Sequence, residues 1–154
     1  MTSIVQLLTT FTGRIDRKQW WIGFVIVVLA SLGGTVLLNP ESLTAEGVPP
    51  VNWVDTIWQL ALLVPGTAIT VKRFNDRDWP WWLGYALAAY SALIYLLPHA
   101  GFAIDPNADW TGTILFWIFF AALIAAFIDN GFLRGTRGPN RYGPDPIPQG
   151  TTTA

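Results

Sequence analysis

Residues 20–39 read WWIGFVIVVLASLGGTVLLN, a stretch of 20 residues without a charged side chain. At a rise of about 1.5 Å per residue, a helix of this length spans roughly 30 Å, which is the thickness of the hydrocarbon core of a bilayer. Gly33 and Gly34 would weaken such a helix in water, but glycine is common in membrane helices. The stretch therefore predicts a membrane-spanning helix.

Three further apolar stretches follow along the chain. Residues 53–71 contain Pro65, residues 81–97 end before Pro98, and residues 112–128 carry alanines spaced four apart, which allow helices to approach closely. All four stretches are apolar on every side, whereas the helices of a soluble bundle have one apolar stripe and one polar face. The first stretch is also longer than the core of a cleaved signal peptide. We predict an all-α protein, an integral membrane four-helix bundle.

The composition agrees with a membrane protein. Of 154 residues, 52% are hydrophobic and 12% are charged, against about 25% charged in soluble domains. The nine Trp residues fit a chain that crosses the interface between membrane and water several times. The absence of Cys excludes disulfides, thiolate nucleophiles and cysteine metal sites. We expect one domain over residues 1–146 and, because the chain after Tyr142 is rich in Pro, Gly and Thr, a disordered tail over 147–154.

The basic residues predict an orientation. All nine Lys and Arg lie before the first apolar stretch, between the second and third, or after the fourth. The two remaining loops, residues 40–52 and 98–111, contain acidic residues and no Lys or Arg. Since basic loops stay in the cytoplasm, both termini are expected there, an N-in, C-in topology. Residues 2–10 are apolar but too short to cross the bilayer, and we expect a short helix at its cytoplasmic interface.

Three segments on the expected cytoplasmic side combine Arg with aromatic and turn residues. They read FTGRIDRKQWW at 11–21, KRFNDRDWPWW at 72–82 and RGTRGPNRYGPDP at 134–146, and each adjoins a span. Together they resemble the signature of the "domain of unknown function 805" family of small bacterial inner-membrane proteins. The resemblance covers residues from about 7 to 146, nearly the whole chain.

The resemblance rests on three motifs in the same order and at the same membrane boundaries. The matching residues are Phe11, Gly13, Arg14, Arg17, Trp20 and Trp21, then Pro65, Arg73, Asp76, Trp81 and Trp82, then Gly138, Asn140, Tyr142, Gly143, Asp145 and Pro146. Lys72, Phe74 and Asn75 stand where the family has Arg, Leu and His. Any proton chemistry of that His is therefore not expected here. The resemblance implies a four-span membrane fold and implies no activity.

Two interpretations of the three segments are open. In the structural one, the segments lock the helix ends together: Asp16 caps the first span, and Asp76 and Asp78 pair with Arg73 and Arg77, or with Arg14 and Arg17. In the binding one, Arg forks and aromatic rings line a pocket for an anionic lipid headgroup or an acidic partner protein. The candidate binding residues are Arg14, Arg17, Arg73, Asp76, Trp81, Trp82, Asn140, Arg141 and Tyr142.

The two interpretations predict different geometry. A structural role requires Arg14, Arg17 and Arg73 to be fully paired with carboxylates or backbone carbonyls. A binding role requires some of these side chains to point unpaired into a concave, partly open space.

Other functions have less support in the sequence. No nucleophile motif or glycine-rich phosphate loop is present, so no catalytic residue is named, and an enzyme or a lipid-handling or transport protein acting on an anionic substrate is the alternative. His99 lies in an outer loop with Asp105 and Asp109, a set that is more often solvated than metal-binding; neither a metal nor a cofactor is expected. No charge lies at mid-membrane depth, where ion pathways need one. The expected partners are membrane lipids, a protein or a second copy, but not nucleic acid.

Overall fold

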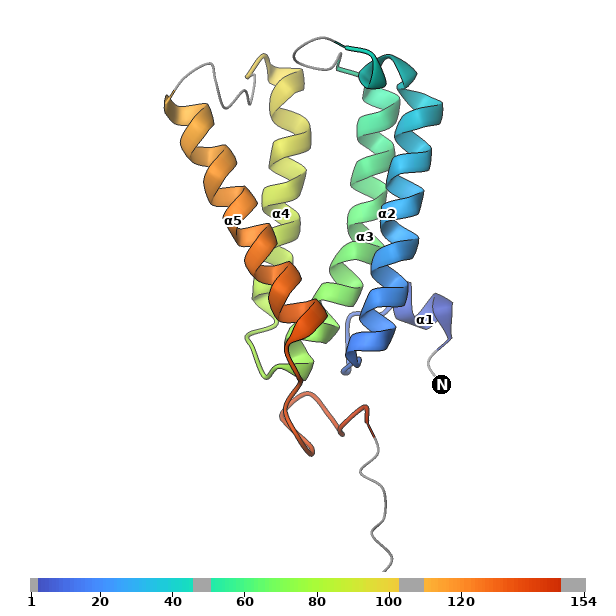
Figure 1. Cartoon of the computed structure of the whole chain (residues 1–154), viewed down its shortest axis with the longest axis vertical. Helices are drawn as coiled ribbons and strands as arrows, with labels where there is room; N and C mark the ends of the chain where they lie inside the picture. Colours follow the sequence, from blue (N-terminus) through green and yellow to red (C-terminus); the bar gives the residue numbers. More distant parts are fainter. Residues whose placement is uncertain (1–2, 46–50, 103–109, 148–154) are drawn as a thin grey trace, which may run out of the picture.

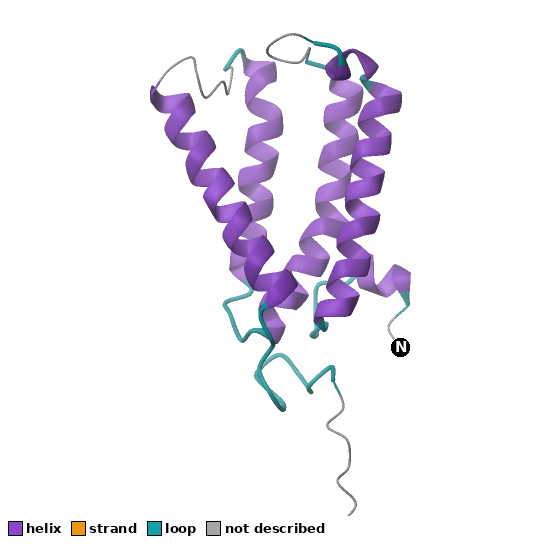
Figure 2. Ribbon diagram, viewed as in Figure 1, coloured by secondary structure: helices purple, strands orange, loops and turns teal. Residues whose placement is uncertain are grey.

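The computed structural model describes residues 3–45, 51–102 and 110–147. The expected tail therefore lies outside the described residues except for Ile147. The helices are α1 (Ile4–Thr9), α2 (Arg17–Leu38), α3 (Trp53–Asp76), α4 (Trp82–Leu96) and α5 (Trp110–Phe132), with short 3-10 helices η1 (Pro40–Leu43) and η2 (Leu97–Ala100). No strand occurs among these residues (Figure 2), and the predicted all-α fold class is confirmed.

Four helices are long and apolar enough to cross a membrane: α2, α3, α4 together with η2, and α5. Few of the residues of α2, α4 and α5 are buried by the rest of the protein. Leu37 and Trp110 are 80% and 85% exposed, and many other large apolar side chains are also on the surface. A soluble monomer does not expose apolar surface of this extent. The predicted four-helix membrane fold is therefore confirmed.

Three helices, α2, α3 and α5, extend past the spans expected from hydropathy at one or both ends, whereas α4 lies within the expected residues 81–97. The largest difference is in α3, which continues from the expected end at 71 to Asp76, and α5 likewise continues from 128 to Phe132. The last turn of α3 carries Lys72, Arg73, Asn75 and Asp76, and all four are buried. Hydropathy could not reveal this turn because its polar side chains are buried against protein and not against lipid.

Both helices of the N-terminal region begin with a capping box. The Asp16 carboxylate accepts from the backbone N–H of Gln19 at 2.7 Å, and the Gln19 side chain accepts from the Asp16 N–H at 3.3 Å, as expected for a cap of the first span. Ser3 and Gln6 do the same for α1, so the predicted short N-terminal helix is present.

Lys72 attaches α1 to the bundle. Its ammonium, in a residue only 2% exposed, donates to the backbone carbonyls of Gln6 at 3.0 Å and Leu7 at 2.6 Å. Carbonyls in the last turn of a helix lack partners within it, so Lys72 satisfies Leu7 O, while Gln6 O also accepts from the backbone N–H and hydroxyl of Thr10. Leu7 packs next to them into the apolar core, together with Ile15 and Trp20.

The four spans converge at one end and separate toward the other (Figure 1). Here α1 and the segment after α5 lie at the converging end, which we call the termini end. An aromatic cluster joins α2 to α5 there, with ring centroids 5.0–6.0 Å apart; its members are Trp20, Trp21, Phe24, Phe127 and Phe132. The buried apolar core thus lies at the termini end, next to the buried polar residues of the last turn of α3.

Toward the opposite end, α2 and α3 are joined by hydrogen bonds inside the bundle. Ser31 donates to the Gln59 side-chain oxygen at 2.8 Å, Gln59 donates to the Thr35 hydroxyl at 2.8 Å, and Thr35 donates to Asp55 at 3.0 Å. Polar side chains in an apolar surrounding need such partners. Asp55 and Gln59, two polar residues within the second apolar stretch, therefore connect α3 to α2.

Candidate functional site

The centre of the termini end is Asp76, the last residue of α3. Its Oδ1 accepts from Arg14 Nε at 3.0 Å and lies 2.9 Å from Arg14 Nη2 in the ion pair, and its Oδ2 accepts from Arg73 Nη1. The three side chains are 4%, 1% and 0% exposed for Asp76, Arg14 and Arg73. We call these three residues and their hydrogen-bond partners the arginine network. One buried carboxylate thus stands between two buried guanidinium groups.

Backbone carbonyls use the remaining donors of Arg14. Nη1 donates to Gly138 O at 2.8 Å and Gly143 O at 3.1 Å, and Nη2 donates to Thr136 O at 2.7 Å. A guanidinium has five N–H donors; Arg14 makes four hydrogen bonds, at least one from each nitrogen, and its Nη2 is also ion-paired with Asp76. Arg14 therefore attaches the segment after α5 to the loop before α2.

Arg73 connects α3 to the end of α5. Its Nε donates to Asn130 O at 2.7 Å, and its Nη2 donates to Leu133 O. The last carbonyls of a helix lack partners within the helix and carry partial negative charge. A buried cation at this position satisfies them, and it places α5 at a fixed position relative to Asp76.

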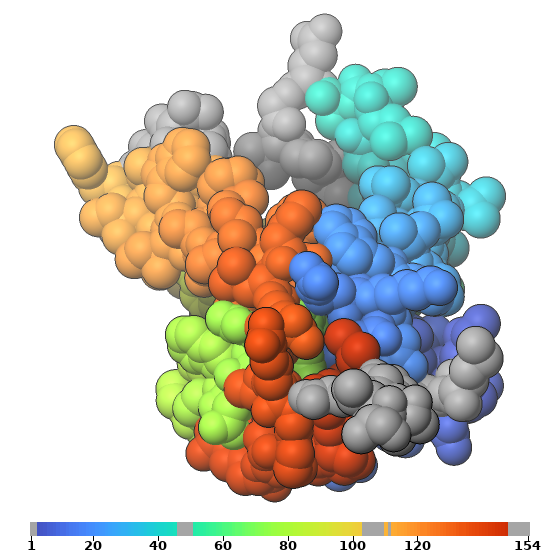
Figure 3. All heavy atoms as spheres, turned by 60° about the horizontal axis from the view of Figure 1, so that its bottom comes forward, coloured from blue at the N-terminus to red at the C-terminus, as the bar shows by residue number. Residues whose placement is uncertain are grey.

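The segment after α5 folds across this end and adds further hydrogen bonds. Thr136 donates to the Asp76 carbonyl through its backbone N–H at 2.8 Å and its hydroxyl at 3.0 Å. Asn140 Nδ2 donates to Asn75 O at 2.8 Å, and Asn75 Nδ2 donates to Gly13 O at 3.0 Å. In Figure 3 this segment, in orange and red, lies beside the green turn between α3 and α4. All three sequence segments thus meet at one place.

A rim of more exposed residues surrounds the arginine network. Arg141 pairs with Asp78 at 3.0 Å, with the two side chains 56% and 45% exposed, and its guanidinium lies 4.8 Å from the centre of the Tyr142 ring. The Tyr142 hydroxyl donates to Trp79 O at 2.8 Å. Asp78 therefore pairs with Arg141 and not with the arginines considered from the sequence, because the segment after α5 brings Arg141 beside the α3–α4 turn.

Two further arginines bind the end of α5. Arg77 Nε pairs with Asp129 at 3.1 Å, and Arg77 Nη1 donates to Arg134 O at 2.5 Å. Arg17 donates to Phe132 O at 3.1 Å from an exposed position. The expected pairing of Arg77 with Asp76 or Asp78 is wrong, because Arg77 leaves the helix on the side that faces α5.

Asp145 is an anion held by backbone donors. Its two carboxylate oxygens accept from Ile147 N–H at 3.0 Å and from Gly138 N–H at 2.9 Å. These hydrogen bonds, that from Ile147 first, hold the pKa of Asp145 below its ordinary value. Asp145 therefore stays ionised and fixes the turn that presents the Gly138 and Gly143 carbonyls to Arg14.

The candidate residues divide into two groups. The structure brings one group together in the network: Arg14, Arg73, Asp76 and Asn140. The other group is exposed: Arg17, Trp81, Trp82 and Arg141. Tyr142 is half-buried. The sequence-based set did not include Asn75, Thr136 or the carbonyls that bind the arginines. Asn75 and Thr136 lie inside the quoted segments, but carbonyl acceptors have no signature in a sequence.

A cavity of about 350 Å³ lies beside Arg14 and Tyr142. It is the concave space that a binding role would need, but each guanidinium nitrogen of Arg14 is already bound to another group of the protein. His99, considered for a metal, has its Nε2 at 2.8 Å from the Thr56 hydroxyl and stacks on Trp53. The acidic residues considered with it, Asp105 and Asp109, lie outside the described residues.

Comparisons with known proteins agree with this fold. A protein-family model described as "Protein of unknown function (DUF805)" matches residues 8–144. The chain is 30% identical over 148 residues to "Uncharacterized protein YiiR" of Escherichia coli, covering 93% of this chain and 90% of the relative. It is 26% identical over 140 residues to "Inner membrane protein YhaH" (88% and 86% covered) and 22% identical over 144 residues to "Inner membrane protein YhaI" (94% and 92% covered), both of Escherichia coli.

No solved structure matches the chain. The inner-membrane relatives and the four apolar helices together show a multi-pass protein of the bacterial inner membrane. Since the family model covers nearly the whole chain, the protein belongs to the DUF805 family.

Proposed function

We propose that this protein is a non-enzymatic inner-membrane protein whose cytoplasmic face is a closed structural lock for the ends of four membrane spans. The observation that carries the proposal is that every guanidinium nitrogen of Arg14 and Arg73 has a hydrogen-bond partner within the protein. Asp76 and five backbone carbonyls use their donors, and neither side chain is exposed. An anion site at this face requires N–H donors that point into open space, so the lock fits the geometry better.

The proposal includes the orientation with both termini in the cytoplasm and a single domain over residues 1–146. The distribution of all nine basic residues supports the orientation, and the packing of the segment after α5 against α3 supports the single domain. Several exposed cations surround the arginine network and are suited to anionic lipid headgroups in the cytoplasmic leaflet. They are Arg17, Lys18, Arg134, Arg137 and Arg141.

Cysteine labelling tests the orientation directly, because the natural chain has no Cys. Thr44 lies beyond η1 and Arg137 lies after α5, and both are exposed. In intact cells, an impermeant thiol reagent is expected to label Thr44→Cys and to label Arg137→Cys only after the membrane is permeabilised. The reverse pattern would show that the termini face outward.

The variant Arg14→Lys distinguishes a structural role of Arg14 from an anion-binding role. Lysine keeps the charge but cannot replace the five-donor fork, so we expect a loss of about 1–3 kcal/mol in the free energy of unfolding. Native mass spectrometry of the protein extracted with its lipids is expected to show the same retained molecules in wild type and variant. Arg137→Lys, on an exposed side chain, is the matched control and is expected to change neither quantity. An anionic molecule lost only from Arg14→Lys would instead identify Arg14 as part of a binding site.

A further inference from the structure

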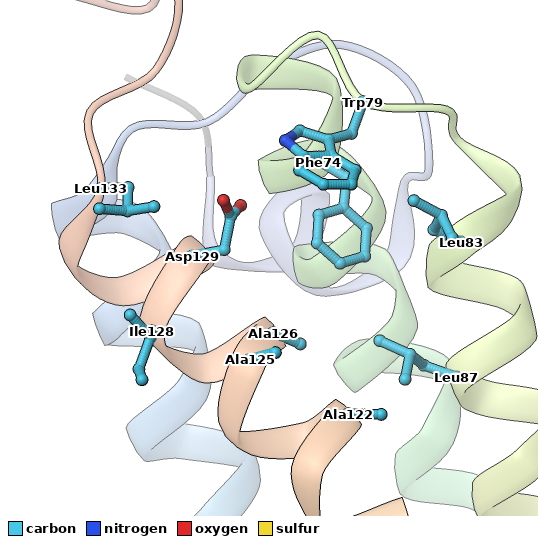
Figure 4. Close-up of a pocket in the computed structure, with 10 residues that line it drawn as sticks. All are labelled: Phe74, Trp79, Leu83, Leu87, Ala122, Ala125, Ala126, Ile128, Asp129 and Leu133. Atoms are coloured by element: carbon cyan, nitrogen blue, oxygen red, sulfur yellow. The ribbon is translucent and has the colours of Figure 1, made fainter. Parts of the chain in front are cut away.

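An apolar crevice of about 530 Å³ lies between α4 and α5 at the termini end (Figure 4). Leu83 and Leu87 of α4 form one wall, and Ala122, Ala125 and Ala126 of α5 form the facing wall. Because alanine side chains are short, α5 cannot fill the space between the two helices. Arg14, Arg73 and Asp76 do not line the crevice, which shares with the arginine network only Leu133, whose carbonyl binds Arg73.

The crevice is bounded at both ends by aromatic side chains. Farther into the membrane, Tyr90 stacks edge-on against Phe119 at 4.8 Å and donates to Leu115 O at 2.9 Å, which joins α4 to α5. At the termini end, Phe74 and Trp79 close the space, with their ring centroids 6.5 Å apart. The distance between α4 and α5 is therefore set on the membrane side of the crevice by the contacts of Tyr90, so the space is part of the fold.

The mouth of the crevice carries charge. Asp129 lines it and pairs through Oδ1 with Arg77 Nε, while Arg77 Nη1 is bound to Arg134 O. Within the part of the chain that the structure describes, these bonds leave Arg77 Nη2 without a partner. The exposed side chain of Arg134 follows on the same segment. The cationic donor at the mouth that these bonds leave unused is therefore Arg77 Nη2.

We propose that the crevice binds one acyl chain of a membrane glycerophospholipid, with the lipid phosphate held by Arg77 at the mouth. The walls belong to membrane-spanning helices, so hydrocarbon is the material that surrounds them and fills the space. A guanidinium with a free N–H binds phosphate oxygens, and the volume lies within the usual 300–1,000 Å³ of small-molecule sites. This site goes beyond the lock, since it uses different residues and leaves Arg14 and Arg73 in their structural role.

The size of the crevice favours a lipid chain over a neighbouring helix. One turn of a helix about 10 Å wide and 5.4 Å long occupies roughly 400 Å³, so the crevice has room for little more than one turn. An acyl chain gains little from leaving the bilayer, because lipid tails are as apolar as the leucines of the wall. Selective retention must therefore come from the fit to a preformed space and from the phosphate contact together.

Native mass spectrometry of the full chain tests the proposal with chosen lipids. The protein is reconstituted separately with dioleoylphosphatidylglycerol, dioleoylphosphatidylethanolamine or dioleoylglycerol, which lacks phosphate, and is then released into detergent. Ala126→Leu fills the crevice, and Ala121→Leu makes the same change at an alanine of α5 outside the crevice lining. Arg77→Gln removes the guanidinium at the mouth.

We expect wild type and Ala121→Leu to retain one phospholipid per chain, and Ala126→Leu to retain it with at least about tenfold lower occupancy. Arg77→Gln should lower phospholipid occupancy about tenfold, the loss of a charge-assisted hydrogen bond. Retention of either phospholipid but not of dioleoylglycerol supports the site. Equal retention by Ala126→Leu and Ala121→Leu would overturn it, as would equal retention of dioleoylglycerol or a dimer that only Ala126→Leu dissociates. Thermal unfolding scans of each variant are the control that it is folded.

Discussion

Asp76→Asn is expected to lower the free energy of unfolding by about 3–5 kcal/mol, the usual cost of removing one partner from a buried ion pair. The replacement has nearly the same shape as Asp76, so the change removes charge and little else. Arg14 and Arg73 would then lie 1% and 0% exposed without a counter-charge. Desolvation of a charge is tolerated only when a partner compensates it, so the two guanidinium groups would repel each other and the helix ends would separate.

The neighbouring pair of Asp78 and Arg141 is the matched control. Asp78 lies two residues further along the chain and also pairs with an arginine of the segment after α5, but both side chains are largely exposed. Because solvent screens such pairs, Asp78→Asn should change the free energy of unfolding by no more than about 1 kcal/mol. Reversible unfolding in mild detergent, followed by circular dichroism, measures both variants. Equal effects of the two changes would mean that Asp76 does not hold the arginines together.

The positions of the spans could be read from the sequence because lipid imposes a simple rule. A membrane-spanning helix needs about 20 predominantly apolar residues, and residues 20–39 and 112–128 are uncharged stretches of about this length. The rule does not hold for the last turn of α3. There Lys72, Arg73 and Asp76 are buried against carbonyls of other segments, and hydropathy treats the same residues as a loop.

The sequence predicted which side chains belong to the candidate site better than it predicted which groups those side chains bind. Arg14, Arg73 and Asp76 could be selected because charged side chains beside turn residues stand out at a membrane boundary. Their geometry was not accessible, since Arg14 binds the carbonyls of Thr136, Gly138 and Gly143, more than 120 residues away in the chain. Every residue has a carbonyl, so only the tertiary fold determines which of them a guanidinium meets.

The choice between a structural lock and an open anion-binding site also depended on the tertiary fold. A sequence gives the number of arginines but not the number of their free N–H groups. Each guanidinium nitrogen of Arg14 has a partner, whereas Nη2 of Arg77, only a few residues from Arg73, has none among the described residues. The structure therefore separates structural arginines from an available one within segments of similar composition.

Gly135→Ala is expected to destabilise the protein by about 2–4 kcal/mol, although it removes no interacting group. A Cβ at Gly135 would overlap both oxygens of the Asp76 carboxylate. A flexible side chain would move away, but Arg14 and Arg73 hold this carboxylate from two sides. Overpacking alone costs about 1–3 kcal/mol, and the displaced hydrogen bonds add to that cost. Gly33→Ala is the matched control: its Cβ meets nothing within 4 Å, and alanine favours the helix by about 0.5–1 kcal/mol.

A double-mutant cycle identifies the cause of the Gly135→Ala effect. If the added methyl acts by displacing the Asp76 carboxylate, the change should cost much less in an Asp76→Ala background, where that carboxylate is gone. A coupling energy of about 1–3 kcal/mol between the two positions is expected from unfolding in detergent. Equal costs in both backgrounds would mean that Gly135→Ala acts on the backbone of the segment after α5. The coupling energy would then be zero, the cost of the added methyl would arise outside the arginine network, and Asp76 would not be the point at which the third segment is fixed to the spans.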